Sequence, residues 1–217
     1  MEFNGFTSMD FDFFRKKDKM SDAEYEKRRN EVKLHFRSLC YEIQKIYHKK
    51  TGGVLEMDKD FQSFNKRSSS IFVERPNDEG KSRLRIQMNS DGITVETYIQ
   101  LGEDITPQKI LNVFADNKNA LWNYAMSGKN TIIYCVLTLK NNKTELYKLT
   151  SAEMNRKGYD SFSEEVSGKL EGCKGIRLAT GYVYNKDECI KQSKAFQNIA
   201  YTAVVETMKL GGQIKIS

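Results

Sequence analysis

The feature that most constrains the fold is an apolar stripe of helical period in the first quarter of the chain. Its members are Val32, Phe36, Leu39, Cys40, Ile43, Ile46 and Tyr47. This spacing places them on one side of an α-helix. Ser21 and Glu24 form a capping box before the stripe, and Gly52-Gly53 follow it as a stop. We therefore expect one long helix, whose apolar side must pack on other elements.

Alternation of apolar and polar residues predicts strands after this helix. Residues 69–75 form one such segment, and residues 83–88 and 93–101 form two more around Asp91-Gly92, a strong hairpin-turn signal. A two-residue turn at that position makes one face of the hairpin apolar and the other polar and positively charged. The expected opposite pairs are Met88 with Val95, Leu84 with Ile99, Gln87 with Glu96, and Arg85 with Tyr98.

The second half of the chain continues the mixture of helices and strands. Thr106-Pro107 open a middle helix, and residues 131–139 (TIIYCVLTL) are apolar enough for a central strand buried on both sides. A strand at 144–149 follows, then short helices that begin after Thr150 and Ser161, a strand at 176–184, and a last helix capped by Asn185. Residues 213–217 are a candidate closing edge strand. These elements predict an α+β fold with a mostly antiparallel sheet of about five or six strands.

Residues 1–20 have no clear period, and we treat them as an N-terminal arm to a single α+β domain over residues 21–217. Phe11, Phe13 and Phe14 precede a basic run from Arg15 to Lys19. The arm therefore suits a short edge strand or a docking peptide. A segment that folds back on its own domain or stays mobile is the simpler interpretation.

Composition excludes several classes of protein. The four cysteines are widely spaced without a CxxC pair and there are two histidines, so neither a zinc site nor a disulfide framework is expected. No cofactor is predicted. Asp10 and Asp12 interrupt the first apolar residues, which therefore do not resemble a signal peptide. No segment reaches the ~20 apolar residues of a membrane span. We expect a soluble, cytoplasmic protein.

One pattern suggests metal-dependent chemistry. Glu56, Asp58 and Asp60 alternate, so a strand would place all three carboxylates on one face. With Glu31 or Glu42 from the long helix, they form a candidate Mg²⁺ site for a nuclease or phosphodiesterase. A solvated acidic loop is the interpretation that the pattern favours.

Signals for nucleophilic catalysis are weaker. Cys173 is the one cysteine outside an apolar pattern, and Lys174 beside it is expected to lower the pKa of its thiol. His35 and His48 lie on the long helix without a partner motif. A helix-boundary role explains each of them.

The positive charge is the strongest functional hint. Lysine and arginine number 35 against 29 acidic residues, a net charge of +6. Our candidate binding residues are Arg67, Arg75, Lys81, Arg83, Arg85, Tyr98, Lys27, Arg28 and Lys33. Arginines beside an exposed tyrosine ring suit nucleic acid. Acidic residues are interleaved with these cations, as on an ordinary solvated surface.

The leading hypothesis is a non-enzymatic binding protein that engages a nucleic acid, a nucleoprotein or an acidic protein. A composition rich in lysine and asparagine and poor in proline is compatible with an inhibitor of phage or mobile-element origin. The alternatives are the Mg²⁺-dependent nuclease and an accessory subunit that docks a partner through the N-terminal arm or the long helix.

Overall fold

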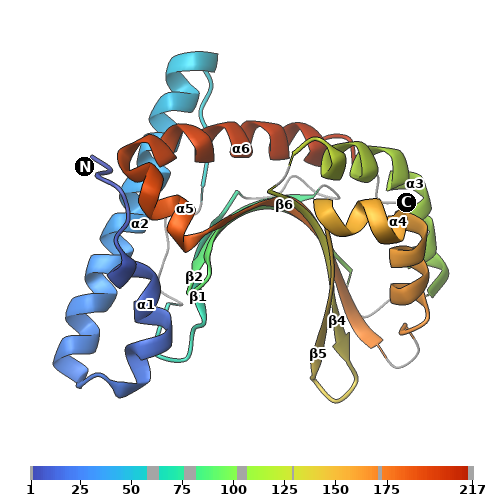
Figure 1. Cartoon of the computed structure of the whole chain (residues 1–217), viewed down its shortest axis with the longest axis horizontal. Helices are drawn as coiled ribbons and strands as arrows, with labels where there is room; N and C mark the ends of the chain where they lie inside the picture. The colour runs from blue at the N-terminus through green and yellow to red at the C-terminus, as the bar shows by residue number, and fades with distance from the viewer. Residues whose placement is uncertain are drawn as a thin grey trace. The chain divides into compact units, whose positions relative to one another are not determined.

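The computed structural model describes residues 2–57, 64–75, 82–101, 107–128, 130–170 and 173–214. Its strands form an antiparallel sheet of order β1-β2-β3-β6-β4-β5, which confirms the predicted α+β class (Figure 1). The elements are α1 (Ser8–Lys16), η1 (Lys17–Lys19), α2 (Asp22–Thr51), β1 (Ser70–Glu74), β2 (Arg83–Asn89), β3 (Gly92–Leu101), α3 (Pro107–Met126), β4 (Thr131–Leu139), β5 (Thr144–Thr150), α4 (Ser151–Ser167), β6 (Cys173–Asn185), α5 (Lys186–Gln192), η2 (Ser193–Ala195) and α6 (Phe196–Gly211).

The chain forms two compact units that share strands and a helix. Unit 1 comprises Met1–Pro76, Arg85–Val95 and Val183–Val205, and unit 2 comprises Asn77–Leu84, Glu96–Tyr182 and Glu206–Ser217. β2, β3, β6 and α6 contribute residues to both. One domain over residues 21–217 stays a prediction. None of the helices in the described ranges is long and apolar enough to cross a membrane.

α2 begins and ends where the sequence predicts. The Ser21 hydroxyl accepts a hydrogen bond from the Glu24 N–H at 3.3 Å, so it satisfies a donor that has no partner within the helix. Gly52 ends the helix with φ of +72°, and its N–H donates to the His48 carbonyl at 2.8 Å. Local signals at both ends thus determine the length of the helix.

The N-terminal arm belongs to the core of unit 1. Residues 8–16 form helix α1, not an edge strand, and α1 contacts α2 (Figure 1). The Asp10 carboxylate accepts from the Thr7 N–H at 2.7 Å, and its other oxygen lies 2.7 Å from Nδ1 of His35 on α2. The buried aromatic side chains of the arm are Phe3, Phe6, Phe11, Phe13 and Phe14.

The β2–β3 connection differs from the predicted turn by one residue. β3 begins at Gly92, so the two-residue loop is Ser90-Asp91 and not Asp91-Gly92. The reason is a local hydrogen-bond pattern: the Asn89 side-chain oxygen accepts from the N–H groups of Asp91 at 2.8 Å and Gly92 at 3.2 Å. Such an Asx turn places the loop one residue earlier.

Gly92→Ala is expected to destabilise unit 1 by about 2–4 kcal/mol. Gly92 has φ of +150°, and a Cβ atom there would lie 1.9 Å from the Tyr184 carbonyl oxygen. Gly52→Ala is the matched control, because φ is also positive there but a Cβ atom would meet nothing within 4 Å. It should cost about 1 kcal/mol. Urea unfolding measures both, and equal losses would contradict the proposed clash.

Unit 2 builds its core between one face of the sheet and the helices α3 and α4. Figure 1 shows these helices along the β4–β5 hairpin. The core residues are Ile99, Val113, Phe114, Leu121, Ala125, Ile133, Cys135, Leu137, Leu149, Tyr159, Phe162, Val166, Leu170, Ile176 and Leu178. In β4 the odd-numbered residues 133–137 are buried in this core, whereas Tyr134, Val136 and Thr138 are half-buried. The prediction that β4 is buried on both sides was therefore wrong.

Two other helices differ in part from the prediction. α4 is one element by its bounds, but Gly158 has a non-helical φ of +76° and divides it into two short helices, as predicted; the second of them begins directly after Gly158 and not after Ser161. The expected last helix divides into α5 and α6 at Ser193, whose φ is +45°. Residues 213 and 214 form no strand, and residues 215–217 of the candidate edge strand lie outside the described residues.

Candidate interaction surfaces

The long helix α2 presents a row of exposed side chains on the side opposite its apolar stripe. Its members recur every three or four residues, which places them on one side of a helix. They are Lys27, Asn30, Leu34, Arg37, Tyr41, Lys45 and His48, and together we call them the α2 outer face. Leu34 is 45% exposed and Tyr41 is 48% exposed, so two large apolar groups at its centre meet solvent.

The α2 outer face is positively charged. It contains no acidic residue, and α2 as a whole carries eight lysines and arginines against five acids. Three acids that flank it are paired within the helix: Glu26 with Arg29 at 3.1 Å, Glu31 with Arg28 at 2.7 Å, and Glu42 with Lys45 at 2.9 Å. The hydrogen bond that Lys45 donates to the Glu42 carboxylate raises the pKa of Lys45, which therefore stays protonated.

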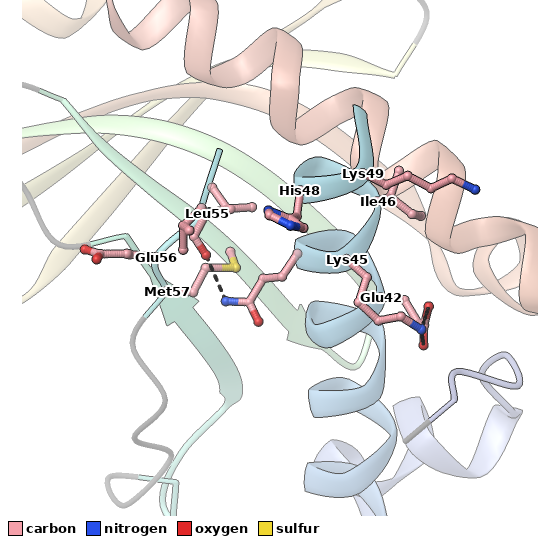
Figure 2. A pocket seen from close by; sticks show the side chains of 10 residues that line it. Glu42, Lys45, Ile46, His48, Lys49, Leu55, Glu56 and Met57 are labelled. Carbon is pink, nitrogen blue, oxygen red and sulfur yellow. Dashed lines mark hydrogen bonds and ion pairs between the residues drawn. The ribbon is translucent and has the colours of Figure 1, made fainter. Parts of the chain in front are cut away.

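A groove adjoins this face at the C-terminal end of α2. Its volume is about 1130 Å³, and it shares Lys45 and His48 with the outer face. Its lining residues are Glu42, Gln44, Lys45, Ile46, His48, Lys49, Val54, Leu55, Glu56 and Met57. The Gln44 amide donates to the Leu55 carbonyl at 2.9 Å, shown dashed in Figure 2, and this bond holds the segment 54–57 beside the helix.

The groove combines apolar side chains with cations. Leu55 and Met57 are buried, and Val54 is largely exposed. Figure 2 shows His48 on the side of α2 that faces Leu55, with Lys45 and Lys49 on the other side. Such a surface is able to bury an apolar side chain of a ligand and to attract carboxylates next to it.

The structure does not assemble the candidate Mg²⁺ site from described residues. Glu56 is exposed and points away from α2, whereas Glu42 lies on the other side of the helix and is bonded to Lys45 (Figure 2). Asp58 and Asp60 lie outside the described residues. Within the described ranges, no three histidine, cysteine or acidic side chains converge as metal ligands would.

Several predicted binding residues are engaged by neighbouring groups. Arg28 pairs with Glu31. Arg85 donates from Nε to Glu74 at 2.6 Å and lies over the Phe72 ring at 4.5 Å. These cations are largely neutralised, which lowers their value for binding a polyanion.

The other predicted cations are divided between the two units. Lys27 and Arg67 are exposed in unit 1, where Lys33 and Arg75 are half-buried. Arg83 is exposed in unit 2, and Lys81 lies outside the described residues. Of this set, only Lys27 belongs to the α2 outer face.

Tyr98 does not offer a stacking surface. It is 2% exposed, and the Arg177 guanidinium lies 4.9 Å from its ring centre. The expectation that its ring stands exposed was therefore wrong, because a cation from β6 covers it.

Arg177 is the centre of a polar cluster that sequence reasoning missed. Its Nη2 donates to Glu96 at 2.9 Å and to the Tyr134 hydroxyl at 2.6 Å, and that hydroxyl donates to the second Glu96 oxygen. Burial, and then the Glu96 charge, raise the pKa of Tyr134. Burial opposes the charge on Arg177, but Glu96 and Tyr134 outweigh it and raise the pKa of Arg177. Arg177 therefore stays protonated.

This cluster lies on the sheet face of unit 2 that points away from α3 and α4. Strand register aligns the residues of β5, β4 and β6 in rows on this face. The rows are Thr144–Thr138–Gly175, Leu146–Val136–Arg177, Lys148–Tyr134–Ala179 and Thr150–Ile132–Gly181. We call these residues the unit 2 open face. The alternation of half-buried Tyr134, Val136 and Thr138 is the sequence signal that would have indicated it.

The contacts of the cysteines and histidines do not assemble a nucleophilic site among the described residues. Burial and the Glu145 charge raise the pKa of Cys173, contrary to the expected lowering, because Lys174 bonds to Asn142 instead. The other three cysteines are buried, and burial raises the pKa of each to about 12. His48 Nδ1 lies 3.1 Å from the Gly53 carbonyl oxygen, and His35 contacts Asp10.

No protein-family model matches the chain, and no curated protein is significantly similar to it. The functional argument therefore rests on these surfaces.

Proposed function

We propose that the chain is a non-enzymatic binding protein whose α2 outer face and adjoining groove bind an acidic helical segment of another protein. The observation that carries this proposal is the exposure of Leu34 and Tyr41, at 45% and 48%, within a row that contains Lys27 and Arg37 and no acid. Apolar groups at the centre of a charged row are typical of helix recognition.

The length of the face matches a helical ligand. From Lys27 to His48, a helix rises by about 32 Å at 1.5 Å per residue. A second helix laid along it would place side chains between those of α2 at the same three- and four-residue spacing. Acids on that ligand would face Lys27 and Arg37, and an apolar residue would enter the groove beside Val54.

A protein ligand suits this face better than nucleic acid. Burial of Leu34 and Tyr41 gains roughly 25 cal/mol for each Å² of apolar surface removed from water. A phosphate backbone offers no apolar surface in return. The apolar centre therefore favours a partner that brings its own aliphatic side chains.

A designed peptide tests the proposal. The probe is a fluorescein-labelled 21-residue helix with leucine at three- and four-residue spacing and glutamate beside it, followed by fluorescence anisotropy. We expect Leu34→Glu to weaken binding at least tenfold, since it removes apolar contact and adds a repelling carboxylate. Lys191→Glu on α5, also exposed, changes the net charge by more and should have an effect below twofold.

The control peptide has the same composition in scrambled order. If it binds as tightly as the patterned helix, or if Leu34→Glu and Lys191→Glu weaken binding equally, attraction of overall charge would explain the binding and the proposal would fail. Unchanged thermal unfolding of both variants shows that the fold is intact.

A further inference from the structure

The unit 2 open face is a second surface on which exposed residues of one kind, lysines, lie close together. Leu146 on its edge strand β5 is 52% exposed, and Lys148 on the same strand is exposed. α3 and α4 contact the opposite face, as Figure 1 shows beside the β4–β5 hairpin. The two faces of the same three strands therefore differ: one forms the core, whereas the other combines these exposed residues of β5 with half-buried Tyr134, Val136 and Arg177 and with buried Ile132 and Ala179.

Positive charge gathers on this face and at its end. Lys148 lies in its rows, while Lys140, Lys143 and Lys174 are exposed at the β4–β5 turn and at the start of β6. Arg177 also lies in its rows, but Glu96 pairs with it. No described residue of the face itself is an exposed acid.

The nearby acids do not cancel this charge. Glu96 is 1% exposed and is bonded to Arg177 and Tyr134. Glu145 pairs with Leu137 of the core, so it lies on the opposite face, where it accepts a hydrogen bond from Tyr147 at 2.6 Å. The exposed charges on the open face and at its end are therefore those of Lys140, Lys143, Lys148 and Lys174.

β6 adds a row of small residues to this face. Gly175, Ala179 and Gly181 contribute almost no side chain to the face, so Arg177 is the one long side chain of β6 in these rows. Its guanidinium lies 4.9 Å from the centre of the Tyr98 ring and 5.6 Å from the centre of the Tyr134 ring. A guanidinium held in this way presents a fixed planar cation, on which a base is able to stack.

We propose that the unit 2 open face binds single-stranded nucleic acid. Lysines at the hairpin end contact phosphates, and the hydroxyls of Thr138 and Thr144 offer hydrogen bonds to sugars or base edges. The occupant is single-stranded because a sheet face is able to stack splayed bases, whereas reading a duplex requires an element that enters a groove. This site does not depend on the α2 outer face.

The test is fluorescence anisotropy of labelled 12-residue oligo(dT) and oligo(U) with the full chain. We expect binding of both at 50 mM salt. For four phosphate contacts, affinity should fall about 50-fold by 200 mM salt. Tighter binding of oligo(U) would assign recognition to the ribose hydroxyl and equal binding to the shared backbone, and either result supports the proposal.

Charge reversal locates the site. Lys143→Glu with Lys148→Glu should weaken oligonucleotide binding at least tenfold. Arg156→Glu with Lys169→Glu is the matched control, because it reverses the same charge at exposed residues, one on α4 and one just after it. Absence of binding at 50 mM salt, equal loss in the two double variants, or equal competition by poly-glutamate would each overturn the proposal. Leu34→Glu should leave oligonucleotide binding unchanged, which separates this site from the peptide site.

Discussion

Arg177→Ala is expected to destabilise the protein by about 3–5 kcal/mol, because it leaves the buried Glu96 carboxylate without the cation that balances its charge. Glu96 is 1% exposed, and its carboxylate takes hydrogen bonds from Arg177 and Tyr134. Removal of the guanidinium also exposes the Tyr98 ring that it covers. Urea unfolding followed by circular dichroism measures the loss.

A double-mutant cycle assigns that loss to the ion pair. Glu96→Gln in the Arg177→Ala background removes the uncompensated charge, so it should restore at least 1 kcal/mol. Lys148→Ala on the same face is the control and should change stability by less than about 0.5 kcal/mol, because Lys148 is exposed. If Arg177→Ala costs no more than Lys148→Ala, the cluster does not stabilise the sheet.

The sequence predicted the ends of helices and strands correctly where these ends depend on interactions between residues close together in the chain. The N-cap residue Ser21 and the glycine after Thr51 lie within a few residues of the helix ends that they determine. The strands of the hairpins have short connections, so alternation located them within one or two residues. The antiparallel α+β class followed from these elements, because consecutive strands in short succession pair with each other.

Burial of β4 and of Tyr98 depended on distant parts of the chain. The run TIIYCVLTL does not show which face is open, because tyrosine, valine and threonine suit a half-buried surface as well as a core. Tyr98 was placed with the polar residues of the hairpin, yet Arg177 covers it, and Glu96 bonds to that arginine across 81 positions of sequence. Only strand order brings β6 beside β3.

The surroundings of the candidate binding residues likewise depend on distant parts of the chain. The sequence shows how many charged residues the chain has, but it does not show which of them form ion pairs in the fold. Arg85 faces Glu74 because the register of β1 and β2 aligns these two residues, and this pairing removes Arg85 from the free cations. The α2 outer face, by contrast, could have been predicted, since it is the complement of the apolar stripe. Leu34 and Tyr41 are apolar residues outside that stripe, and they are the sequence signal that indicates this face.

The N-terminal arm carries the second large prediction: Phe11→Ala should destabilise unit 1 by about 3–5 kcal/mol. Phe11 is fully buried, and its ring centre lies 5.4 Å from that of Phe6, which in turn lies 6.2 Å from that of Phe196. If the arm were a docking peptide that does not pack on unit 1, the same substitution would leave the stability of unit 1 unchanged. Met9→Ala, on the exposed side of the same helix, is the control and should cost less than about 0.5 kcal/mol. Thermal unfolding compares the two variants.

The stability of Phe11→Ala decides which experiment is able to test whether residues 1–20 bind a partner. If Phe11→Ala unfolds unit 1, deletion of residues 1–20 would remove five buried phenylalanines and abolish any partner binding through loss of the fold. A lost partner would then say nothing about where that partner binds. Substitutions of exposed residues, such as Met9 on α1 and Leu34 on α2, keep this core and therefore separate docking from folding. Equal stability of Phe11→Ala and Met9→Ala would reverse the argument and make the arm a free segment.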